Sequence, residues 1–162
     1  MLDRADFRQA LRHVFEEKIP FCKALGLKFS LDGGRAEVRF QRADFMLGNV
    51  KYKVLHGGVT ASVLDSIAGI AILCRMAELT PKPDVIEQLK EFGRISTIDL
   101  RIDYIEPANA DAFIATAEVL RVGNHVANVQ MKMVAGDTGR AVAVGSAAFA
   151  IRGQKKEGGG GI

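Results

Sequence analysis

The chain has 162 residues, 48% hydrophobic and 25% charged, which is the balance of an ordinary soluble globular protein. A chain of this length forms one domain with a sizeable core. The net charge of +3 is mild and no stripe of basic and aromatic residues appears. This pattern argues against nucleic-acid binding but suits a small polyanionic ligand.

Two further features bear on location. Cys22 and Cys74 lie far apart, a pattern of reduced, buried thiols and not of a disulfide framework. The first residues carry acids and no apolar core, so we expect no secretory signal and a cytoplasmic location. The one apolar run that approaches a membrane span, 59–73, is too short and contains Asp65. We therefore expect a buried helix there and no membrane partner.

The first third of the chain predicts a helix and two strands. Apolar residues recur at three- and four-residue spacing over 3–18, at Phe7, Leu11, Val14 and Phe15. Two strands are predicted at 25–31 and 36–40, joined by a hairpin turn at 32–35 that contains two glycines. Residues 41–55 show no period, so an irregular loop is expected.

A long helix is predicted from Gly57 to Leu79, ended by Pro81 and Pro83. Small residues and large aliphatic residues alternate around most of its circumference. Such a helix must be covered on nearly all sides.

Four strand-like segments follow, at 95–105, 111–122, 125–135 and 140–152. In the first, alternation places one set of side chains on one face: Ile98, Leu100, Ile102 and Tyr104. The opposite face receives the polar set: Thr97, Asp99, Arg101 and Asp103. Short turns dictate antiparallel neighbours. The predicted fold is α+β, one domain over 1–152 with a curved antiparallel sheet around one central helix, an extra N-terminal helix and a disordered Gly-rich tail over 153–162.

The start of the central helix is the strongest candidate site. A helix start offers unpaired N–H groups and a positive dipole end, and the Gly57-Gly58 pair allows close approach of a ligand. Asp65 is the only charged side chain between His56 and Arg75. At ~1.5 Å per residue, Gly57 and Asp65 lie about 12 Å apart. Either they are unrelated, as a tight turn and a buried helix residue, or each completes a site with the other member of a dimer.

His56-Gly57-Gly58, followed by Asp65, resembles the signature of hotdog-fold acyl-CoA thioesterases of the PaaI type, in the 4-hydroxybenzoyl-CoA thioesterase-like superfamily. The resemblance continues in 97–108, 120–125 and 139–145, and so covers most of the chain. It implies the hotdog fold.

The resemblance also implies roles for five residues. Asp65 would be the catalytic carboxylate, as a general base or as a nucleophile. Gly57 would donate its backbone N–H to the oxyanion. His56 would shape the loop and orient the thioester, Asn49 would orient water or substrate, and Thr97 would lie near the attacked carbonyl.

For the substrate's coenzyme A portion, the resemblance implies binding by a second set: Gly58, Arg121, Gly123, Asn124 and His125. Arginine suits phosphate through paired, charge-assisted hydrogen bonds. Coenzyme A would enter only as part of the substrate and product, with no cofactor required. The three histidines lie in separate elements, so no metal site is expected.

The sequence thus favours an acyl-CoA thioesterase working as a homodimer or a dimer of dimers. Two tyrosines, no tryptophan and an aliphatic helix favour a medium-chain fatty acyl group. Two alternatives stay open. An acyl-thioester hydratase or dehydratase would need a histidine in the helix. A non-catalytic acyl-CoA-binding protein normally carries a DNA-binding segment, and the 24 residues before the first strand hold one predicted helix.

Overall fold

The computed structural model describes residues 4–31 and 35–153. The N-terminal part consists of α1 (Arg4–His13), the π-helical turn η1 (Val14–Lys18), α2 (Pro20–Ala24), β1 (Lys28–Ser30), β2 (Ala36–Gln41), the 3-10 turn η2 (Asp44–Met46), β3 (Leu47–Asn49) and β4 (Val54–Leu55). The remainder consists of α3 (Gly57–Leu79), α4 (Val85–Lys90), the 3-10 turn η3 (Glu91–Arg94), β5 (Ile95–Tyr104), β6 (Ala112–Val122), β7 (Val126–Ala135) and β8 (Ala141–Ile151).

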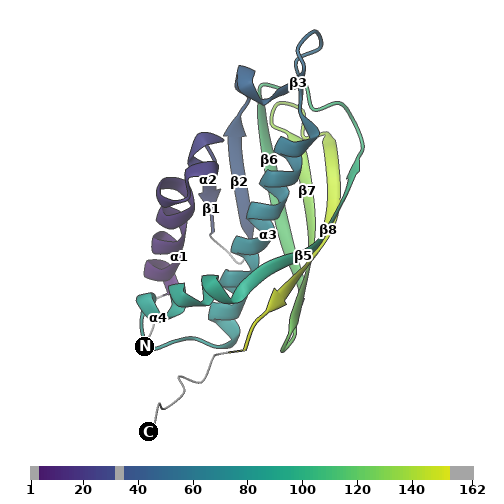
Figure 1. Cartoon of the computed structure of the whole chain (residues 1–162). Helices are drawn as coiled ribbons and strands as arrows, with labels where there is room; N and C mark the ends of the chain where they lie inside the picture. Colours follow the sequence, from purple (N-terminus) through teal and green to yellow (C-terminus); the bar gives the residue numbers. More distant parts are fainter. Residues whose placement is uncertain (1–3, 32–34, 154–162) are drawn as a thin grey trace, which may run out of the picture.

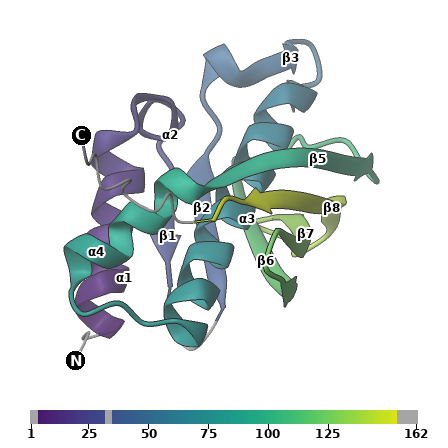
Figure 2. The same cartoon turned by 60° about the horizontal axis from the view of Figure 1, so that its bottom comes forward.

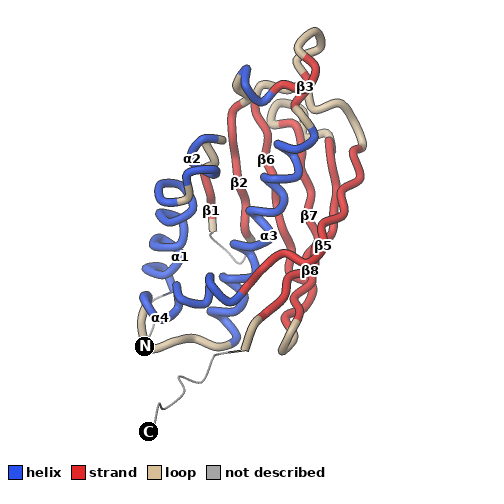
Figure 3. Tube along the Cα trace, in the orientation of Figure 1, coloured by secondary structure: helices blue, strands red, loops and turns tan. Residues whose placement is uncertain are grey.

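Six strands form one antiparallel sheet in the order β1-β2-β6-β7-β8-β5, and β3 pairs with β4 in a separate hairpin. The sheet curves around α3, which lies along its concave side, while α1 and α4 lie beyond β1 (Figure 1). Figure 3 shows the β3–β4 hairpin projecting past the end of the sheet. The predicted fold, a curved sheet around one central helix with an extra N-terminal helix, is confirmed.

Helix α3 is buried because it is apolar around most of its circumference. It packs mainly against β6 and β7 and also contacts β5, β8 and β2 (Figure 2). By length and composition it could cross a membrane, but 56% of its most apolar stretch is buried inside the fold. In the part of the chain that the structure describes, α3 is therefore the core helix of the fold.

The N-terminal helices join the same core. Phe7 and Leu11 of α1 are buried, and Phe15 of η1 makes edge-to-face ring contacts with Phe29 and Phe92. These contacts tie the N-terminal segment to β1 and to the turn that precedes β5.

Several predicted elements need correction. The opening helix widens into a π-helical turn over Val14–Lys18, and Pro20 begins α2 at a position that proline favours. Residues 41–55 form η2, β3 and β4 instead of an irregular loop, and β1 is shorter than predicted. Helix α4 and η3 were missed. The predicted turn residues 32–34 and the tail from 154 lie outside the described residues.

The alternation predicted for β5 is wrong at its beginning. A bulge between Thr97 and Asp99 leaves Thr97 opposite the buried Phe149, and Asp99 opposite Ala148. Ile98 is the extra residue and is 60% exposed. Because a bulge shifts the two-residue period by one, Thr97 lies on the face that covers α3.

Candidate active site

The start of α3 is fixed by its neighbours. His56 is the N-cap residue, with φ −63° and ψ 133°, and its ring Nδ1 accepts a hydrogen bond of 3.0 Å from the Gly58 N–H. The His56 N–H donates to the Met46 carbonyl at 2.8 Å. A Cβ on Gly48 would lie 2.8 Å from the His56 Cα, so only glycine lets β3 approach this closely. The β3–β4 hairpin therefore locates the helix start.

Gly57 is the first helical residue, and its two polar backbone groups differ. Its carbonyl accepts a 2.7 Å hydrogen bond from the Tyr104 hydroxyl. Its N–H precedes the first helical hydrogen bond, and among the hydrogen bonds of the described residues it has no acceptor. This N–H stands at the positive end of the α3 dipole and is free to bind an anionic oxygen.

A cavity of about 590 Å³ opens at this point. Gly57, Asn49 and Tyr104 supply polar groups on its wall. Its other lining is largely apolar, with Val54, Leu55, Ile105, Pro107, Ala108 and Val142. The Asn49 Oδ1 accepts a 3.3 Å hydrogen bond from the Tyr52 N–H. This size and mixed lining are typical of a small-molecule site.

Asp65 lies half-buried further along α3. The Thr97 hydroxyl donates a 2.8 Å hydrogen bond to its Oδ1. On the adjacent residue, the Ser66 hydroxyl bonds the Ser62 carbonyl and contacts the Cys22 Sγ at 3.7 Å. Burial raises the pKa of the Cys22 thiol, and the charge of Asp65 adds to this effect. The carboxylate thus lies between β5 and α2.

Within this single chain, Gly57 and Asp65 lie apart. Both lie in α3, eight residues apart, which is about 12 Å at ~1.5 Å per residue. Strand β5 contacts both: Tyr104, its last residue, bonds Gly57, and Thr97, near its beginning, bonds Asp65. The two groups therefore sit at opposite ends of one strand.

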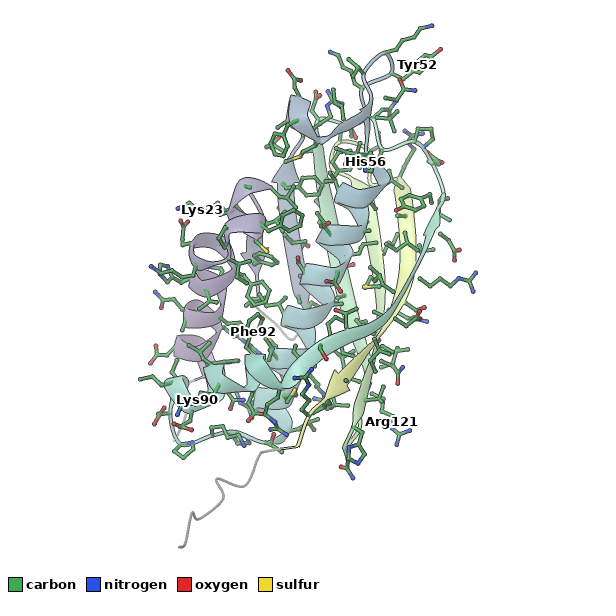
Figure 4. All side chains as sticks on the ribbon, viewed as in Figure 1. Lys23, Tyr52, His56, Lys90, Phe92 and Arg121 are labelled. Atoms are coloured by element: carbon green, nitrogen blue, oxygen red, sulfur yellow. The ribbon has the colours of Figure 1, made fainter. Side chains whose placement is uncertain are left out.

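The residues predicted to bind coenzyme A fall into two places. Gly58 lies at the start of α3, and its N–H is already donated to His56. The other four belong to the β6–β7 turn or its edge: Arg121, Gly123, Asn124 and His125. The side chains of Arg121, Asn124 and His125 are exposed. Figure 4 shows Arg121 and His56 at opposite ends of the molecule.

The β6–β7 turn is tight and is joined to β8. The Gly123 N–H donates to the Val126 carbonyl at 2.9 Å, and the Ile151 N–H donates to the His125 carbonyl at 2.7 Å. Because Ile151 pairs with Ile95, the turn adjoins the beginning of β5. It therefore lies toward the Asp65 end of that strand.

Sequence reasoning missed Tyr104 as a site residue. In the alternation of β5, Tyr104 falls in the apolar set, so the sequence pattern predicted only that its side chain packs in the core. The only available signal was its position three residues before Pro107 in the segment that resembles the family.

Comparisons with known proteins identify the family of this chain. A family profile described as "Thioesterase superfamily" matches residues 52–142, which include the start of α3, Asp65 and all of β5. Medium/long-chain acyl-CoA thioesterase YigI of Salmonella typhimurium is 38% identical over 131 residues, covering 77% of this chain and 83% of its own.

Two solved structures show the same fold. A protein of Shewanella oneidensis related to the thioesterase superfamily has a TM-score of 0.83 and 28% identity, with 91% of this chain and 97% of that chain covered. The Escherichia coli PaaI protein from the phenylacetic acid degradation operon has a TM-score of 0.72 and 21% identity, with 93% and 97% covered. The chain therefore belongs to the thioesterase superfamily, and it is a thioester hydrolase with the hotdog fold of the PaaI type.

Proposed function

We propose that the chain hydrolyses medium- or long-chain fatty acyl-CoA to the free acid and coenzyme A. The acyl-CoA class is supported by the relative YigI, whose name states a medium/long-chain acyl-CoA substrate. An aliphatic acyl chain also suits the largely apolar cavity beside Gly57. The observation that carries the mechanism is that opposite ends of β5 hold two groups: Thr97 bonds the Asp65 carboxylate, and Tyr104 bonds the carbonyl of Gly57, whose N–H is free.

Two copies joined through β5 would bring these groups together. Among the described strands β5 pairs with β8 alone, so its other edge is open. That edge carries Ile98 and Tyr104, which are 60% and 57% exposed. An open edge with exposed apolar side chains favours pairing with another strand.

The register of this strand pairing follows from the hydrogen bonds that Thr97 and Tyr104 make to α3. When β5 pairs antiparallel with its own copy about a two-fold axis at Arg101, and Ile98 again stays out of the ladder as the bulge residue, Thr97 lies opposite Tyr104 of the second copy. Thr97 holds Asp65 and Tyr104 holds Gly57. Each Asp65 then faces the Gly57 N–H of the other protomer, and the dimer has two equivalent sites.

The proposed reaction needs one carboxylate and one oxyanion donor. As a general base, Asp65 takes a proton from water while the water oxygen attacks the thioester carbon. The carbonyl electron pair moves to oxygen, and the Gly57 N–H binds the resulting oxyanion. Collapse of the intermediate breaks the C–S bond, and the thiolate takes up a proton. In the nucleophilic route, the Asp65 oxygen attacks first and the C–S bond breaks, which releases the thiolate and leaves an acyl-aspartate anhydride; water then hydrolyses this anhydride to the free acid and restores the carboxylate.

The remaining site residues support these steps. Thr97 orients Asp65 by bonding Oδ1, which leaves Oδ2 for water or for the acyl carbon. His56 shapes the helix start by accepting the Gly58 N–H, and so leaves the Gly57 N–H for the thioester. Asn49 borders the same cavity and orients water or substrate.

Coenzyme A enters as part of the substrate. Its phosphates would pair with Arg121 and His125 at the exposed β6–β7 turn, where Gly123 and Asn124 keep the backbone accessible. Gly58 would bound the site at the start of α3. The enzyme would work in the cytoplasm as a dimer or a dimer of dimers, without a metal or further cofactor.

A panel of acyl-CoA esters with a thiol-reactive dye tests the proposal. We expect coenzyme A release from medium and long chains, and a loss of at least about 100-fold in Asp65→Asn, since a general base contributes about 100- to 10,000-fold. Asp137→Asn, in the exposed β7–β8 turn, is the control and should keep wild-type activity. Tight acyl-CoA binding without thiol release would indicate a non-catalytic binding protein. An active Asp65→Asn variant would refute the mechanism.

A further inference from the structure

We propose that Tyr104 is a positioning residue for the oxyanion donor, and that its hydroxyl holds the Gly57 N–H in line for the reaction. This inference rests on the proposed role of Gly57. It concerns a side chain that does not itself touch the thioester, and it assigns a function to the 2.7 Å hydrogen bond between the Tyr104 hydroxyl and the Gly57 carbonyl.

The peptide group between Gly57 and Gly58 is held at both ends. Tyr104 donates to its oxygen, and its N–H donates to the His56 Nδ1 at 3.0 Å. The preceding peptide is held at its oxygen, because the His56 carbonyl accepts from the Val59 N–H at 2.9 Å. Of the polar groups of these two peptides, the Gly57 N–H is the one that no described hydrogen bond uses. The network thus selects a single donor.

This restraint is needed because the donor sits at a flexible point. Two successive glycines have wide backbone freedom, and the first turn of a helix lacks the hydrogen bonds that stiffen its interior. A displacement of about 1 Å in a reacting group can cost about 100-fold in rate. Hydrogen bonds on both sides of the Gly57–Gly58 peptide remove this freedom.

Tyr104 is well placed to supply the restraint. It ends β5 opposite the buried Ala143, so its backbone is fixed by the sheet. Its ring also packs on Gly57: a Cβ built on that residue would lie 3.3 Å from the ring Cζ and 3.1 Å from the hydroxyl oxygen. Since β5 is also the open edge strand, the same residue links the donor to the surface proposed for dimerisation.

Tyr104→Phe tests the inference because it keeps the ring on Gly57 and removes only the hydroxyl. We expect kcat to fall about tenfold, the upper range for one hydrogen bond, with KM changed less than twofold. The control is Thr138→Val, which removes a hydroxyl from the exposed β7–β8 turn and should retain wild-type kcat.

The same substitution in a Gly57→Pro background separates positioning from a structural defect. Proline removes the Gly57 N–H, so loss of the Tyr104 hydroxyl should then have no further effect on kcat. A structural defect would lower the unfolding temperature or the dimer fraction of Tyr104→Phe together with its kcat, and would overturn the inference. Wild-type kcat in Tyr104→Phe, with a slow Gly57→Pro, would also overturn it and leave the proposed function intact. A fully active Gly57→Pro would instead refute the oxyanion role itself.

Discussion

The role of the Gly57 N–H can be isolated by comparing Gly57→Pro with Gly57→Ala. Both substitutions add a Cβ, but only proline removes the N–H. Gly57 is the first residue of α3, where proline is favoured because the missing N–H has no helical partner. The preceding residue, His56, already has the extended conformation that proline requires of its neighbour, with φ −63° and ψ 133°.

The expected magnitudes follow from the contacts of the added atom. A Cβ at Gly57 would lie 3.1 Å from the Tyr104 hydroxyl oxygen, the far end of a movable side chain. Gly57→Ala should therefore weaken the hydrogen bond to Tyr104 and lower kcat by up to about tenfold. Gly57→Pro should lower kcat a further 100- to 1,000-fold or so, the typical cost of one oxyanion donor.

The assay is steady-state release of coenzyme A at saturating acyl-CoA, with thermal unfolding measured alongside. Gly93→Ala serves as a control, because a Cβ there meets nothing within 4 Å. All three variants should unfold within about 1 kcal/mol of wild type, as expected where no core contact is lost. Equal kcat in the alanine and proline variants would refute the assignment of the oxyanion donor to this N–H.

Two further predictions concern the edge strand and a thiol. Ile98→Lys places a charge on the open edge of β5, where it should prevent pairing with a second copy. Light scattering should then show monomers, and the specific activity should fall at least about 100-fold. A fully active monomer would contradict the shared site. Burial raises the pKa of Cys74 to about 11 from an ordinary 9.0. At pH 8 the thiolate fraction of Cys74 should therefore be about 100-fold lower in the native protein than in denaturant, and its reaction with a disulfide dye should be slower by the same factor. Equal reaction rates in the two states would contradict this prediction.

Much of the fold follows from local signals in the sequence. Helix α3 begins and ends as predicted because a histidine cap and a glycine pair open it, and Pro81 and Pro83 prevent its continuation. The last three strands match within one residue at each end, because turn residues separate their apolar runs. These features depend on near neighbours in the chain.

Other features depend on tertiary contacts and could not be predicted. The β5 bulge reverses the faces of Thr97 and Ile98, and it is set by pairing with β8. Gly48 looked like part of a loop, but its contact with His56 fixes the β3–β4 hairpin against α3. The hydrogen bond from Tyr104 to Gly57 joins residues 47 positions apart. The residue pattern within one segment cannot predict a contact between two residues so far apart in the sequence.

The central claim is that each active site combines Asp65 of one protomer with Gly57 of the other. Mixing Asp65→Asn and Gly57→Pro chains after joint unfolding and refolding tests it most directly. Random pairing makes half of the dimers mixed, and each mixed dimer has one site with both groups intact, so about a quarter of wild-type activity should return. If the mixture stays as inactive as the two separate variants, the two groups do not act across the dimer interface.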